Sequence, residues 1–190
     1  MKPINELLIT PKEGNRYDNH SRLGDGKLII NTSIESHTHV NRVGVVEEIP
    51  IEYKGPIRIG DEVILHHNVF RIYYDMKGNE QSGPCHFFND FYLVPEDQIY
   101  FYASKPNEWK STGEYCFIEP LDKVQGDVLK IEQYEELKGK ITHDNKYLNN
   151  IGIFNGNIVS FHPDVEYEFR VEDKILYRVK NERVCMTLTK

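Results

Sequence analysis

Short apolar runs separated by turn residues recur along the chain and predict β-strands. The runs Glu62–Leu65 and Ile158–Phe161 follow Gly-Asp and Gly-Asn, a pattern typical of a tight turn that leads into a half-buried strand. Residues 75–79 contain Gly and Asn, which tolerate positive φ, and predict the tip of a hairpin. One stretch of helix formers, residues 131–139, predicts a helical turn or two that ends at Gly139. The expected fold class is all-β.

The two halves of the sequence align with each other without gaps over two stretches. Residues 59–69 lie over residues 155–165 with two Val, one Gly and one His recurring in place, and residues 91–101 lie over residues 176–186. Upstream, Gly44 corresponds to Gly139. Such self-similarity indicates a duplicated unit.

We therefore expect two tandem small β-barrels of one fold. The first would cover residues 1–103, with a long mobile loop at about 15–41, and the second residues 104–190, with an altered loop at about 123–138. The boundary is placed where Pro106 and polar neighbours interrupt the strand pattern.

Composition strengthens the all-β expectation and excludes several function classes. The chain has 12 Tyr and 9 Phe against 3 Met and 1 Trp, and aromatic residues favour strands. The formal net charge of -7 and the absence of a basic stripe in the sequence argue against nucleic-acid binding. Neither an apolar run of membrane-spanning length nor a long secretory signal is visible. Three widely spaced cysteines suit reduced thiols in a cytosol.

The sequence offers little for catalysis or metal binding. His37 and His39, the pair His66-His67 and the pair Cys85-His86 contain good zinc ligands, but their spacing is unlike that of zinc fingers. No G-x-S-x-G elbow and no phosphate-binding loop occurs. We expect no catalytic residue, no metal and no cofactor, and therefore no enzyme.

The apolar triplet Leu28, Ile29 and Ile30 stands inside a polar, Gly-containing and His-rich stretch. It is either an ordinary strand of the barrel core or an exposed hook that binds a partner. Burial of three such side chains would contribute about 5 to 9 kcal/mol. Ordering six flexible residues, at roughly 1 to 2 kcal/mol each, would consume most of this gain. The polar flanks favour the hook, in a segment that orders on binding.

The order of these landmarks resembles that of the GroES-type co-chaperonins, in their tandem double-domain form. The resemblance covers nearly the whole chain. The domain of that family has an opening strand, a loop with an apolar triplet after a Gly, a returning Gly-x-Val strand, a Gly-Asp turn and a terminal strand. In this chain these are residues 6–9, 26–32, 44–46, 59–63 and 97–101, with residues 115–121, Gly139, Gly156 and Val184 as second-half landmarks.

Two segments depart from the family pattern. The stretch between Val46 and Ile57, where the family has its roof hairpin, is short and contains Pro50 and Pro56. In the second half, the loop region has only Val128-Leu129 as an apolar pair.

The resemblance implies a co-chaperonin that caps a GroEL-type chaperonin ring and assists ATP-dependent folding of a client by that partner. Leu28, Ile29 and Ile30 would contact the chaperonin, with Val128 and Leu129 as the candidate contact of the second domain. The chain would form a homo-oligomeric ring in the cytoplasm, in a host cytoplasm if viral, or in an organelle stroma. The rival function is a viral structural or assembly adaptor that reuses the barrel, and an enzyme on a small-barrel scaffold ranks third.

Overall fold

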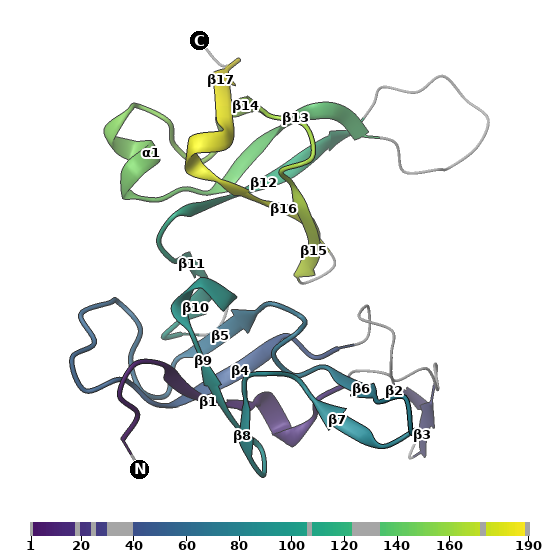
Figure 1. Ribbon diagram of the computed structural model, residues 1–190. Coiled ribbons are helices and arrows are strands. Elements are labelled where there is room, and N and C mark those ends of the chain that lie inside the picture. Colours follow the sequence, from purple (N-terminus) through teal and green to yellow (C-terminus); the bar gives the residue numbers. More distant parts are fainter. Residues whose placement is uncertain are drawn as a thin grey trace. The chain divides into compact units, whose positions relative to one another are not determined.

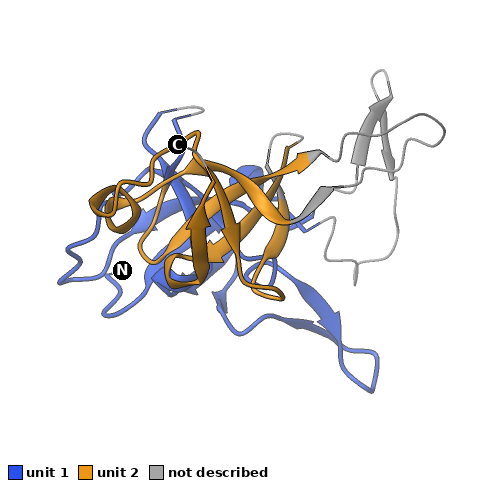
Figure 2. Cartoon of the chain, turned by 90° about the horizontal axis from the view of Figure 1, so that it is seen from above, with its two compact units in different colours: residues 1–110 blue, residues 111–190 orange. Residues whose placement is uncertain are grey.

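The computed structural model describes residues 2–17, 20–23, 26–29, 40–105, 108–122, 134–171 and 174–188. It describes the backbone alone at residues 20–23, 26–29, 122, 134–136 and 170–171. The chain forms two compact units, Met1–Lys110 and Ser111–Lys190, which Figure 2 colours separately. Strands dominate both units (Figure 1), which confirms the all-β class. The one α-helix of the described part has five residues, far too few to cross a membrane.

The first unit is built on a seven-stranded sheet with the order β11-β10-β5-β4-β1-β9-β8. Two further pairs, β2-β3 and β6-β7, form separate two-stranded sheets. The elements of this unit are β1 (Leu7–Pro11), η1 (Lys12–Gly14), β2 (His20–Leu23), β3 (Gly26–Ile29), β4 (Val43–Glu48), β5 (Glu62–Leu65), β6 (Ile72–Tyr74), β7 (Glu80–Ser82), β8 (His86–Phe88), β9 (Phe91–Val94), η3 (Glu96–Gln98), β10 (Ile99–Ala103) and the boundary strand β11 (Lys110–Ser111).

The second unit is built on a six-stranded sheet with the order β15-β16-β12-β13-β14-β17. Its elements are β12 (Tyr115–Asp122), β13 (Tyr134–His143), α1 (Lys146–Asn150), β14 (Ile158–Phe161), β15 (Tyr167–Val171), β16 (Lys174–Lys180), η4 (Asn181–Arg183) and β17 (Val184–Thr187). All of its sheet pairings are antiparallel.

The two units share one strand order. Read from the same end, β8-β9-β1-β4-β5-β10 corresponds to β15-β16-β12-β13-β14-β17. The register also agrees, because Pro11 pairs with Gly44 in the first unit and Pro120 pairs with Gly139 in the second. The aligned halves of the sequence therefore fold into equivalent strands.

The turn that precedes β5 and the turn that precedes β14 are also the same. Gly60 and Gly156 both have positive φ, +86° and +93°, which glycine adopts without steric cost. Each donates its amide to the strand before the turn, Gly60 to Val46 and Gly156 to Ile141, at 2.8 Å in both cases. The Gly-Asp and Gly-Asn turns predicted from the sequence are confirmed, and each leads into a strand with three buried residues.

Each unit has its own apolar core. In the first, alternate residues of β5 and β9 point inward, and Phe70 packs edge-to-face on Tyr92 with ring centroids 4.7 Å apart. In the second, Cys116, Ile118 and Ile141 are fully buried around Val159. Burying one such Ile or Val stabilises its unit by roughly 1.5–3 kcal/mol.

The expected closed barrels are wrong for the described strands, because both sheets are open. The first ends at β11 and β8, and the second at β15 and β17, and among the described residues no pairing joins these edges. The edge strand β8 has three residues, with a register shift between His86 and Phe88. So short and irregular a strand offers few backbone groups for a further partner.

The helix predicted over residues 131–139 is wrong over residues 134–139, the part of that stretch that the structure describes. Residues 134–143 form β13, which pairs with β12 on one side and β14 on the other. Two ladders of hydrogen bonds outweigh an intrinsic helix preference of a few tenths of a kcal/mol per residue. Leu137, at φ +56°, departs from regular strand geometry within it. In contrast, the hairpin tip at residues 75–79 is confirmed, because it joins β6 to β7 and Asp75 accepts the amides of Lys77 and Asn79.

We expect Gly139→Ala to destabilise the second unit by about 1–3 kcal/mol. A Cβ at this position would overlap Ile118 Cγ2 and the carbonyl oxygen of Glu119, and neither can move without disturbing the central strand β12. The neighbouring Lys140 is exposed, so Lys140→Ala is the matched control. Urea unfolding followed by NMR signals of the second unit measures both variants, and equal stabilities would contradict the predicted clash.

Candidate functional site

The long excursion between β1 and β4 starts and ends at a hydrogen-bonded base. Tyr17 and Val40 form an isolated antiparallel bridge, and the Asn41 amide donates to the Arg16 carbonyl over 2.9 Å. Val40 is 5% exposed and belongs to the core of the first unit. The folded unit therefore brings the two ends of the segment 18–39 together, which removes loop closure from the cost of any binding event.

The Asn41 side chain ties both sides of this base. Its Nδ2 donates to the Asn15 carbonyl over 2.6 Å and, more weakly, to the Lys12 carbonyl over 3.5 Å. Its Oδ1 accepts the Val43 amide over 2.9 Å. One amide side chain thus forms hydrogen bonds with the backbone before the excursion and with β4 after it, which a hydrophobic residue could not do.

A second set of contacts joins residues 16 and 17 to the start of β6 and the two residues before it. The Tyr17 hydroxyl accepts the Ile72 amide over 2.8 Å and donates to the Ile72 carbonyl over 3.3 Å. Arg16 donates to the carbonyls of Phe70 and Arg71 over 3.1 and 3.2 Å. Its guanidinium also lies 5.7 Å from the centre of the Tyr92 ring. The base is therefore joined to the core, and these residues carried no distinctive signal in the sequence.

Within the excursion, β2 and β3 form their own antiparallel hairpin. His20 pairs with Ile29, and Ser21 with Leu28. β3 pairs with β2 and is not a strand of the seven-stranded sheet. The predicted contact residues Leu28 and Ile29 lie in β3 by their backbone, whereas their side chains, and all of Ile30, lie outside the described residues. Their role stays a prediction.

The second unit has an excursion at the same place, between β12 and β13, and its outermost described pair is Asp122 with Tyr134. The predicted contacts Val128 and Leu129 lie outside the described residues. The two excursions therefore leave equivalent strands of equivalent sheets, as the duplicated strand order requires.

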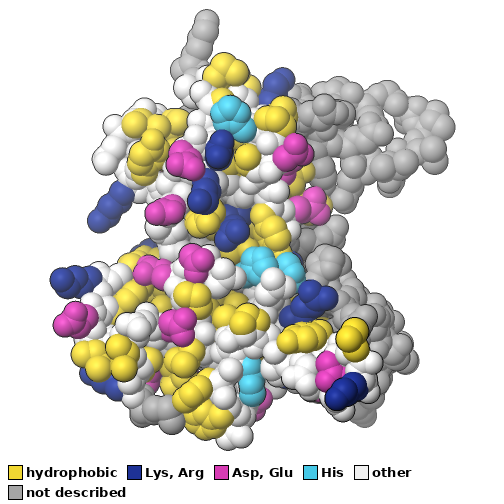
Figure 3. All heavy atoms as spheres, viewed as in Figure 1, with side chains coloured by type: hydrophobic (Ala, Val, Ile, Leu, Met, Phe, Trp, Pro, Cys, Tyr) yellow, Lys and Arg dark blue, Asp and Glu magenta, His cyan; other side chains and the backbone are white. Residues whose placement is uncertain are grey.

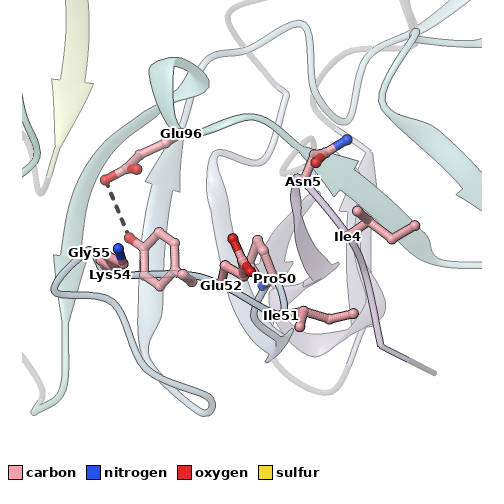
Figure 4. Close-up of a pocket in the computed structure, with 9 residues that line it drawn as sticks. Ile4, Asn5, Pro50, Ile51, Glu52, Lys54, Gly55 and Glu96 are labelled. Carbon is pink, nitrogen blue, oxygen red and sulfur yellow. Dashed lines mark hydrogen bonds between the residues drawn. The ribbon is translucent and has the colours of Figure 1, made fainter.

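A hollow of about 610 Å³ opens between the N-terminal segment and the turn at residues 50–55 of the first unit (Figure 4). Ile4 and Ile51 line it and are 73% and 61% exposed. The Tyr53 hydroxyl donates to Glu96 over 3.3 Å, and burial, followed by the Glu96 charge, raises the pKa of Tyr53. A phenol held protonated beside a carboxylate is suited to a structural contact rather than to general-base chemistry. This segment, where the resemblance puts a roof hairpin, contains no strand among residues 49–61.

The histidines and cysteines do not gather into a site in the described part of the chain, where no group of three or more His, Cys, Asp or Glu could hold a metal ion. His66 and His67 stack at 4.3 Å, and Asn68 donates its amide to His66 Nδ1. Burial raises the pKa of Cys85 to about 11 and that of Cys116 to about 12. These two thiols stay protonated near neutral pH and are poor nucleophiles.

No protein-family model matches the sequence, and no curated protein matches it either.

We expect Asn41→Ala to lower the stability of the first unit by about 1–2 kcal/mol, because it removes the hydrogen bonds to Asn15 and Val43. Amide hydrogen exchange at Val43 should accelerate. Asn15 joins the base through its backbone carbonyl, so Asn15→Ala is a control of the same residue type. Equal exchange at Val43 in both variants would show that the amide side chain does not hold the base.

We also expect the second unit to lose stability as the pH falls below about 6.5. Burial lowers the pKa of His143, with Asp144 opposing this effect and Lys174 adding to it. As the pH falls, the unfolded chain therefore binds this proton before the folded chain does. The free energy of unfolding is complete above about pH 6.5 and decreases as the pH falls below that value. Urea unfolding of the second unit at pH 7.5 and 5.5 should show a smaller decrease for His143→Gln. The exposed His162 provides the control, because His162→Gln should keep the contribution of His143.

Proposed function

We propose that this chain is a co-chaperonin that caps a GroEL-type chaperonin ring through the segment between β1 and β4. The observation that carries the proposal is the hydrogen-bonded base of this segment. Tyr17 forms a β-bridge with Val40, and the Asn41 side chain bonds to the backbone on both sides of the base. An excursion of this length, with an apolar triplet inside polar sequence and its ends fixed to a folded body, has the properties of a binding arm. Leu28, Ile29 and Ile30 are the proposed contacts, and Val128 and Leu129 the corresponding contact of the second unit.

We further propose that both units have the GroES-like fold. The support is the order of the landmarks: opening strand, excursion, returning strand with Gly44 or Gly139, Gly turn, and terminal strand. The first strands, β1 and β12, pair on both sides within their own sheets, so the proposed homo-oligomeric ring would join neighbouring chains through edge strands, of which the last strand of the second unit, β17, is one. The chain would have no catalytic role or cofactor, and ATP hydrolysis would belong to the chaperonin.

The energetics explain why such a lid would be reversible. Three buried apolar side chains contribute about 5 to 9 kcal/mol, and ordering the arm consumes most of it. The fixed base and the local pairing of β2 with β3 reduce the number of residues that binding must order. A single arm still binds weakly, and several arms on one ring bind firmly through high effective concentration. Release then needs only a modest change in the partner.

Native mass spectrometry of the purified chain with a chaperonin tests the proposal. A co-chaperonin forms a closed ring and joins the chaperonin only when nucleotide is present. Assembly without chaperonin binding under any nucleotide condition would favour the rival function. In that case the chain would be a viral structural or assembly adaptor. The proposed location is the cytoplasm, of a host cell if the protein is viral, where the chaperonin and its unfolded client occur together.

We predict that the double substitution Leu28→Ser and Ile29→Ser abolishes chaperonin binding and leaves the melting temperature unchanged. These residues would be needed by the partner and not by the core. Met76 is a fully exposed apolar side chain on another protrusion, the β6–β7 tip, so Met76→Ser is the matched control and should bind normally. A large fall in melting temperature for the double variant would place the triplet in the protein's own interior and reject the proposed contact.

A further inference from the structure

A small hollow on the second unit is lined by three basic side chains and two tyrosines. It has a volume of about 240 Å³, and its lining is Tyr115, Val165, Tyr167, Arg178, Lys180 and Arg183. Figure 3 shows Lys and Arg side chains, interspersed with Asp and Glu, on the face of this unit that carries β16 and β17. Three basic side chains around one hollow stand out in a chain whose net charge is -7.

Strand geometry brings these side chains together. Arg178 and Lys180 are two residues apart on β16 and so project from the same face. Tyr115 in β12 pairs with Lys180 in β16, and Tyr167 in β15 pairs with Arg178 in β16. Arg183 follows in η4, directly after β16. Four elements thus contribute to one site, which no local sequence motif could reveal.

The two tyrosines hold Arg178 in place. Its guanidinium carbon lies 4.3 Å from the centre of the Tyr115 ring and 5.5 Å from that of Tyr167. Such cation–π contacts use the face of the guanidinium group, which donates hydrogen bonds in its own plane. An arginine fixed in this way loses little side-chain entropy on binding an anion, as preorganised sites require.

Basic side chains outnumber acidic ones among the residues that line the hollow. Its lining contains no Asp or Glu. Arg183 pairs with Glu182 at 3.9 Å, with both side chains more than half exposed, so this ion pair is weak. Glu166 accepts the amide of Val165 over 3.1 Å and faces that backbone group. The lining itself thus combines three basic side chains with no acidic one.

The first unit provides an internal comparison, because the same fold positions exist there without the charge. The matched strands align Arg178 with Leu93, Lys180 with Pro95, and Arg183 with Gln98. Cys85 takes the place of Tyr167, since its carbonyl accepts the Leu93 amide. The first unit has the same strand order without these cations, so the fold itself does not require them.

We infer that the second unit binds a compact oxyanion in this hollow, of the phosphate class, either as free phosphate or as the phosphoryl group of a larger molecule. A dianion with several acceptor oxygens matches three convergent cations better than a carboxylate does. The volume is below the roughly 300–1,000 Å³ of pockets that enclose whole drug-sized ligands. This inference is independent of the proposed co-chaperonin function.

The test is a titration of the isotope-labelled full chain with sodium phosphate at constant ionic strength, followed by NMR chemical shifts. Saturable shifts are expected at Tyr115, Tyr167 and Arg178. The double substitution Lys180→Gln and Arg183→Gln should weaken binding at least tenfold, and because both side chains are exposed the fold should be retained. Lys140→Gln, which removes an exposed charge of the same unit outside the hollow, should bind as the wild type does.

The other outcomes are decisive as well. Shifts that do not saturate, or that are the same in the double variant, would overturn the inference, as would equally tight binding of acetate. Titration with phenyl phosphate separates the two sources. Tighter binding than that of inorganic phosphate assigns the hollow to a phosphoryl group on a larger molecule, and equal or weaker binding assigns it to free phosphate.

Discussion

The close approach of β1 to β4, and of β12 to β13, is the constraint on which the rest of the structure depends. Gly44 and Gly139 face Pro11 and Pro120 at the centre of the two sheets, where a Cβ would strike the side chain and backbone of the neighbouring strand. This contact sets the register between the strand where each excursion begins and the strand where it ends. The bases of both excursions are therefore consequences of core packing, and only their tips are open to change.

The two units share a scaffold and differ in the surfaces proposed to bind partners. The strand order, the Gly turns and the burial pattern of β5 and β14 are the same in both units. The differences lie in the excursions and at the sheet edges, where substitution costs little stability. The first unit carries the apolar triplet proposed to bind a chaperonin, and the second carries the basic hollow around Arg178. Two copies of one scaffold can thus offer two kinds of surface within a single chain.

The errors made from the sequence have a common physical origin. Residues 131–139 have helix formers, yet residues 134–143 are a strand, because pairing with β12 and β14 contributes more than local preference. Small barrels were expected from the turn-and-strand pattern of the two halves, whereas both sheets are open among the described strands. In both cases the deciding interaction joins segments far apart in the chain, which hydrophobic pattern and propensity do not register.

The sequence by itself determined the β class, the internal repeat, the two Gly turns and the hairpin tip at residues 75–79. These features depend on local rules: alternating burial, and a backbone conformation that Gly or Asn adopts readily. Only the tertiary structure decided that Tyr17 is fastened to Ile72, and that Arg178 lies between two tyrosines from separate strands. Such sites are assembled by register between distant strands, and one residue of slip would move every side chain to the opposite face.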